Sequence, residues 1–211
     1  MRHRELEIPS GDILIHAGDI ITALQMTPPY ISIMYENFMD FIKWFSSQPH
    51  KLKIFIAGNH DIVLDANLVG LEMKNKILSQ LPPDVIYLEN SVININIPII
   101  QGPCKKLRIY GIPNGASHGP AFPNILYDKM YQKAHILITH TPPFGILDIA
   151  ANGRHAGSEK LAEYIKTFQG LHIFGHIHES HGVYNQKNTL FVNASIPFPK
   201  LNQPVRVCIN L

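Results

Sequence analysis

Four short polar motifs, each following an apolar run, hold the residues best suited to chemistry in this sequence. They are Gly18-Asp19, Gly58-Asn59-His60-Asp61, Thr139-His140 and Gly175-His176-Ile177-His178. The runs before them are short and rich in β-branched residues, which is typical of buried strands. In an open sheet with helices on its faces, loops at the carboxyl ends of strands share one crevice, where ligands usually bind. Carboxylate, carboxamide and imidazole groups meeting there suit hard and borderline metal ions, so the pattern predicts a metal site.

The motif Gly58–Asp61 divides its chemistry among neighbouring residues. The carboxamide oxygen of Asn59 is a neutral hard ligand, which leaves His60 free to point at a substrate. As an imidazolium, His60 could give a proton to a leaving oxygen as general acid. Asp61 could accept a hydrogen bond from that ring and fix its tautomer and orientation. Taken alone, the same residue types also fit an ordinary turn.

The other three motifs carry the remaining candidate ligands, and each has a simpler alternative. Asp19 could bridge two ions with its two oxygens, or cap a turn. His140 could bind a metal, or make a structural hydrogen bond at the end of its strand. His176 and His178 would project to the same side of an extended chain, or be solvated loop histidines. Because all four motifs occupy the same kind of position, we favour the metal-binding interpretation.

The elements that must position these motifs alternate between strand and helix in the first third of the chain. Strands are expected over 12–17 and 53–57, and helices over 30–47 and 67–81, which predicts an α/β architecture. The closely spaced apolar runs 92–97 and 107–111 have no helix between them and predict antiparallel pairing. A loop over 113–123, helices over 124–133 and 158–168, and a strand over 205–209 complete the expectations. We expect a single domain covering residues 1–211.

Composition excludes several classes of protein. The 211 residues are 45% hydrophobic with a formal charge of +2, which lacks the footprint of a dedicated nucleic-acid binder. No run reaches the roughly 18 apolar residues of a membrane helix. No secretory signal follows Met1, and Cys104 and Cys208 fit no close metal-binding spacing. We expect two reduced thiols in a cytoplasmic protein that binds no membrane.

The ordered motifs resemble the calcineurin-like metallophosphoesterase superfamily, whose pattern is D-x-H, GD, GNH[DE], H and GHxH. Four of these five blocks are present, and the segments 14–19, 139–143 and 175–179 resemble the metallophosphoesterase-domain-containing (239AB-like) phosphodiesterases. The resemblance implies a four-layer αββα sandwich and a phosphoesterase, most simply a phosphodiesterase, that uses a metal-activated hydroxide. Mn²⁺, Fe or Zn²⁺ would fit the ligands. The implied substrate is a small phosphoester such as a nucleotide.

The resemblance also implies a role for each candidate residue. By it, Asp19 bridges two ions, Asn59, His140 and His176 complete one of them, and His178 serves the other. His60 would be the general acid, supported by Asp61.

The D-x-H block of the family is absent from this sequence. The first strand and two ligands of the second ion are therefore expected to be missing, which leaves that site incomplete. His3 lies near this position and could substitute, or be a surface histidine. Two functions follow: a phosphoesterase impaired by the loss, or a catalytically degenerate relative that binds metal, nucleotide or protein.

Overall fold

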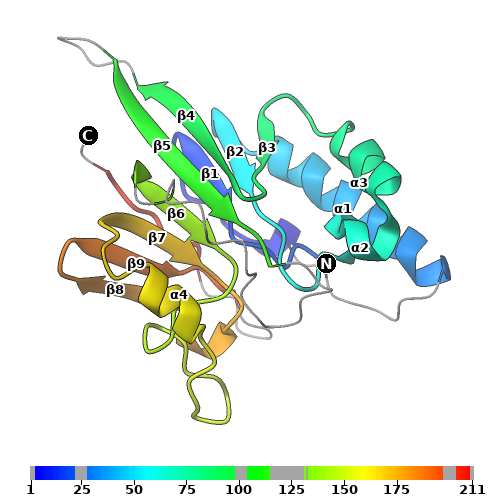
Figure 1. Ribbon diagram of the computed structural model, residues 1–211. Coiled ribbons are helices and arrows are strands. Elements are labelled where there is room, and N and C mark those ends of the chain that lie inside the picture. Colours follow the sequence, from blue (N-terminus) through cyan, green and yellow to red (C-terminus); the bar gives the residue numbers. More distant parts are fainter. Residues whose placement is uncertain are drawn as a thin grey trace.

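The computed structural model describes residues 3–21, 28–97, 104–114, 131, 133–196 and 203–209. Nine strands form two sheets within these residues (Figure 1). The strands are β1 (Ile13–His16), β2 (Leu52–Phe55), β3 (Val85–Tyr87), β4 (Ser91–Ile97), β5 (Lys105–Ile112), β6 (Ile136–Thr139), β7 (Gly170–Phe174), β8 (Gly182–Gln186) and β9 (Thr189–Asn193). The helices are α1 (Pro28–Ser46), α2 (Ala66–Val69), α3 (Leu71–Leu78) and α4 (Glu159–Tyr164), with 3-10 turns η1 (His3–Glu5), η2 (Ile62–Leu64) and η5 (His178–Ser180).

The two sheets differ in size and in strand direction. The first is parallel, in the order β1-β2-β3. The second has the order β4-β5-β6-β7-β9-β8, in which β5, β6, β7 and β9 are parallel neighbours. The edge strands β4 and β8 pair antiparallel, and β4 with β5 confirms the pairing expected for 92–97 and 107–111.

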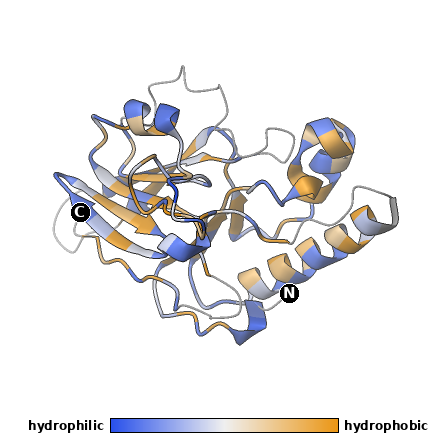
Figure 2. Ribbon diagram, turned by 90° about the horizontal axis from the view of Figure 1, so that it is seen from below, coloured by the Kyte–Doolittle hydropathy of each residue, from blue (hydrophilic) through white to orange (hydrophobic). Residues whose placement is uncertain are grey.

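Side-chain alternation along the central strands builds four layers. In β2, Phe55 faces the core beneath α1, whereas Ile54 faces the core between the two sheets. In β6, Leu137 packs in the core beside α4, whereas Ile136 faces the inter-sheet core. Period-two alternation thus gives the central strands of each sheet two buried faces. The order helix, sheet, sheet, helix confirms the predicted αββα sandwich, with α1–α3 and α4 on its outer faces (Figures 1 and 2).

Several element boundaries differ from the expectations. The helix expected over 67–81 is two helices, because Gly70 adopts φ 84° between α2 and α3. The helix expected over 158–168 ends at Tyr164, and no strand forms over the described residues 205–209. The loop expected over 113–123 and the helix over 124–133 fall almost wholly outside the described residues.

Two expectations based on composition can be compared directly with the structure. Cys104 and Cys208 are both free and exposed, as expected for reduced thiols. No helix in the described part of the chain has the length and apolar character needed to cross a bilayer.

Candidate metal centre

The predicted ligands converge at the carboxyl ends of four parallel strands. Asp19 follows β1 and Asn59 follows β2 in the first sheet, whereas His140 follows β6 and His176 follows β7 in the second. One ligand atom each from Asp19, His140 and His176 lies within 4.8 Å of the others. Both sheets therefore contribute to one group of ligands, as the strand-end pattern predicts.

Two glycines allow the backbones of the first sheet to meet behind this group. Gly18 adopts φ 94°, and a Cβ there would lie 2.6 Å from both the Gly58 nitrogen and His140 Nδ1. A Cβ on Gly58 would lie 2.2 Å from Asp19 Oδ1. No side chain fits at either position, so the close approach of the loops requires glycine.

His140 is oriented by the loop of the opposite sheet. Its Nδ1 lies 2.8 Å from the Ala17 carbonyl oxygen, to which it donates. Its Nε2 lies 3.0 Å from Asn59 Oδ1 and 3.2 Å from Asp19 Oδ2. The proton on Nδ1 is used in the bond to Ala17, so Nε2 faces the two oxygens without a proton of its own. A second proton or a cation must therefore lie among these three atoms to offset their electron-rich character. The donor set therefore fits a divalent metal ion.

Electrostatics at this point favour a carboxylate facing a cation. Burial opposes the charge of Asp19, but hydrogen bonds from His140 and from the His60 backbone nitrogen lower its pKa to about 2. Burial likewise opposes protonation of His140, and the hydrogen bond to Asp19 outweighs it, so its pKa is raised. Asp19 therefore stays ionised and available as a ligand at neutral pH.

His176 and His178 occupy different environments in the structure. His176 adopts φ 68°, and its ring centroid lies 5.0 Å from that of His140. Burial, followed by the neighbouring charge of His140, lowers the pKa of His176 to about 4, which keeps the imidazole neutral as a metal ligand must be. His178 is exposed at the start of η5 and lies outside the group formed by the other three. Its role as a ligand of a second ion stays a prediction.

Asp61 holds the backbone of the site. Its Oδ2 accepts from the nitrogens of Gly58 (2.7 Å) and Asp19 (2.9 Å), and its Oδ1 accepts from Ile21 (3.1 Å). Burial and the nearby Asp19 charge raise its pKa to about 7. Asp61 therefore clamps the β1 and β2 loops together, and its support of His60 expected from the sequence stays a prediction.

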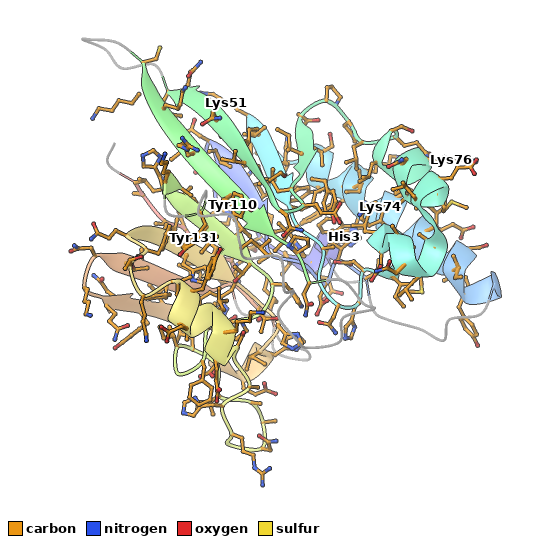
Figure 3. The ribbon with its side chains drawn as sticks, viewed as in Figure 1. His3, Lys51, Lys74, Lys76, Tyr110 and Tyr131 are labelled. Carbon is orange, nitrogen blue, oxygen red and sulfur yellow. The ribbon has the colours of Figure 1, made fainter. Side chains whose placement is uncertain are left out.

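His3, labelled in Figure 3, belongs to a packed aromatic cluster. Its ring lies 4.9 Å from that of Trp44 and 5.6 Å from that of Phe41, and Nε2 lies 3.3 Å from Asp40 Oδ2. The ring is only 8% exposed, so His3 is not the surface histidine considered from the sequence. Among the described residues it is not part of the ligand group either.

Two polar residues shape the site without having been singled out for these roles. Asn193, at the end of β9, donates from Nδ2 to the carbonyl oxygens of Leu147 (3.0 Å) and Ile177 (2.8 Å). Asp148 is fully buried in the loop that follows His140. Only the structure shows that Asp148 is buried and that its carboxylate meets the backbone nitrogens of Gly145 and Gly157.

Comparison with known proteins agrees with this geometry. The family model for calcineurin-like phosphoesterases matches residues 3–180. The chain belongs to the calcineurin-like phosphoesterase family. Membership supports metal-dependent phosphoester chemistry and divalent metal binding at the level of the superfamily.

Individual relatives of this phosphoesterase domain are moderately similar. Human metallophosphoesterase domain-containing protein 1 is 30% identical over 95% of the chain and 65% of its own length. A UPF0046 protein of Caenorhabditis elegans is 31% identical over 92% of the chain and 70% of its own length. A probable rhamnogalacturonate lyase C of Emericella nidulans is 32% identical over 83% of the chain but only 16% of its own length. The chain thus spans less than two thirds of several relatives that it matches.

Proposed function

We propose that this chain is a metal-dependent phosphodiesterase acting on a small phosphoester, a class that includes nucleotides. The observation that carries the proposal is the convergence of Asp19, His140 and His176 within 4.8 Å, with Asn59 Oδ1 beside them. A divalent ion held there supplies Lewis-acid chemistry, which stabilises charge on phosphoryl oxygens and activates water. Mn²⁺, Fe and Zn²⁺ all suit these nitrogen and oxygen donors.

In this proposal the residues of the chain divide the work. Asp19, Asn59, His140 and His176 hold the ion, and the Ala17 carbonyl fixes the metal-facing nitrogen of His140. His60 follows Asn59 directly, and its backbone nitrogen donates to Asp19 Oδ1 at 2.9 Å. That bond keeps the His60 backbone beside Asp19, and the proposal gives the His60 side chain the role of general acid for the leaving oxygen.

A second candidate function is a degenerate relative that binds metal or nucleotide without turnover. It is favoured by the composition of the ligand group, which among the described residues serves one ion and leaves His178 outside. Two-metal hydrolases place their ions about 3.5–4 Å apart and need ligands for both.

Metal content and hydrolysis, measured together, separate the two functions. The chelated protein is reloaded with Mn²⁺ or Zn²⁺, and elemental analysis is paired with hydrolysis of bis-p-nitrophenyl phosphate. We expect His140→Ala and His176→Ala to lose metal, and His60→Ala to keep it while turnover falls about 10²–10⁴-fold. Arg154→Ala, a change in an exposed loop residue, is the matched control. Unchanged metal content in both ligand variants would overturn the site, and retained metal without turnover would favour the binding function.

A further inference from the structure

The loop that follows His140 is closed on itself beside the metal centre. We call residues 141–158 the rim loop. Within it, the Ser158 nitrogen donates to the Pro142 oxygen (2.9 Å) and the Phe144 nitrogen donates to the Ser158 oxygen (3.1 Å). The Ala156 nitrogen donates to the Asp148 oxygen (2.9 Å). These backbone bonds join the two ends of the loop, so it is a fixed structure rather than a free excursion.

Asp148 organises the interior of the rim loop and fixes one exposed imidazole. Its Oδ2 accepts from the nitrogens of Gly145 and Gly157, both at 3.0 Å. Its Oδ1 lies 2.7 Å from His155 Nδ1. Because Nδ1 donates to this buried carboxylate, the His155 ring has one orientation although its side chain is 45% exposed. No hydrogen-bond partner of Nε2 is found in the described part of the chain.

A second exposed ring lies against this imidazole. The centroid of Phe144 lies 4.9 Å from that of His155, with 45° between the ring planes, and Phe144 is 41% exposed. We call Phe144 and His155 the ring pair. Two fixed, adjoining aromatic surfaces that remain open to solvent can receive a third planar group with little further ordering.

The rim loop, which carries the ring pair, is joined to the loop that carries His176 and His178. Asn193 Nδ2 joins the Leu147 oxygen of the rim loop to the Ile177 oxygen between those two histidines. Ser180 Oγ of η5 donates to the Ile149 oxygen at 2.8 Å. The rim loop also begins directly after His140, so Phe144 follows a ligand by four residues and lies within about 14 Å of it.

We propose that the ring pair receives the aromatic part of an aryl or heteroaryl phosphoester whose phosphate lies at the metal centre. This rests on the proposed function and narrows its substrate class to esters with a planar ring near the phosphorus. Phe144 supplies the stacking face, and His155 supplies a second ring together with Nε2 for a polar edge of the ligand. Asp148 acts through His155 as a positioning residue.

Two phosphonates that resist hydrolysis test this without requiring turnover. Binding of phenylphosphonate and methylphosphonate to the Zn²⁺-loaded chain is measured by calorimetry, and saturation-transfer NMR reports contact with the phenyl protons. We expect phenylphosphonate to bind about tenfold tighter, a difference of 1.4 kcal/mol. Phe144→Ala and His155→Ala should each remove most of that preference and leave methylphosphonate affinity unchanged.

Matched variants keep the test decisive. Ile149→Ala removes another exposed apolar side chain of the rim loop and should leave the preference intact. Phe144→Leu retains packing without the ring, in case the alanine variant is unstable, and should also lose the preference.

Equal affinity for both phosphonates in the wild type, absence of binding by either, or a preference that survives in the Phe144→Ala, His155→Ala double variant overturns the inference. Hydrolysis without a ring preference would leave the proposed function standing alone. A ring preference without hydrolysis of any ester would leave only the ring-pair site.

Discussion

Two buried carboxylates organise the two parts of the site, and they have different neighbours: a second carboxylate beside Asp61 and an imidazole beside Asp148. Asp61, behind the ligand group, accepts three backbone amides and has the carboxylate of Asp19 close by. Asp148, inside the rim loop, accepts two backbone amides and faces the imidazole of His155. The same device therefore clamps a loop in both places, once beside a like charge and once beside a basic ring.

The difference between the two places shows where function, and not stability, determines the arrangement of the charged groups. Burial, together with the like charge of Asp19, raises the pKa of Asp61 to about 7, and this is an unfavourable arrangement for stability alone. It persists because one carboxylate must hold the two loops while the other faces the ion. In the rim loop no second carboxylate is needed, and a carboxylate paired with an imidazole satisfies the same backbone amides.

The largest effect is expected from removing the clamp behind the metal centre. Asp61→Ala leaves the amides of Gly58, Asp19 and Ile21 without their acceptor, at about 1–3 kcal/mol for each buried group. We expect the free energy of unfolding to fall by about 3–5 kcal/mol and metal retention to be lost. Urea denaturation and elemental analysis measure the two effects.

A second buried aspartate supplies the control for this change. Asp65 caps α2 by accepting from the Asn67 nitrogen at 3.0 Å, so Asp65→Ala should cost only about 1 kcal/mol and spare the metal. Equal losses in the two variants would remove the special role assigned to Asp61.

The like charge should also appear in the pH dependence of the metal-free chain. Between about pH 4 and pH 7 folded Asp61 holds a proton that the unfolded chain has released, so its contribution to stability falls as pH rises. The wild type should lose up to about 1.4 kcal/mol per pH unit relative to Asp61→Asn across this window.

This comparison must be made between variants and not on the wild type alone. His16 and His172, whose pKa values are lowered by burial to about 4 and about 3, contribute the opposite slope below pH 6.5. Their contribution cancels in the difference between wild type and Asp61→Asn. Parallel stability curves for these two proteins would show that Asp61 is ionised in the folded chain at pH 5.

The smallest effect is expected in the rim loop. In Asp148→Asn the amide oxygen can still accept from Gly145 and Gly157, while its NH₂ group turns toward His155. We expect a loss of about 1 kcal/mol from exchanging charged for neutral hydrogen bonds. Metal content should not change. Loss of metal in this variant would show that the ligand group and the rim loop form one cooperative unit.

The residues of the candidate ligand group were predictable from the sequence, whereas those that hold the backbone were not. Asp19, Asn59, His140 and His176 each follow a recognisable strand, and strand direction places them together. The partners of Asp61 are amides of residues up to 42 positions away, and these have no residue-type signature.

The sequence also predicted the layers better than the ends of the elements. Strand–helix alternation indicated an α/β architecture, and the family resemblance implied the αββα sandwich that the three buried cores confirm. Helix ends depended on single residues, such as Gly70, whose positive φ cannot be read from apolar spacing.

The ligands come from both sheets, so the metal centre lies at the contact between the two sheets. Asp19 and Asn59 belong to one sheet, His140 and His176 to the other, and the His140–Ala17 bond already crosses between them. An ion seated there fastens the two layers at one end, while packed side chains hold the rest of their length. Chelation should therefore loosen the contact between the sheets at this end first. Amide exchange should rise first in the loops after β1, β2, β6 and β7 and last in the middle of the strands.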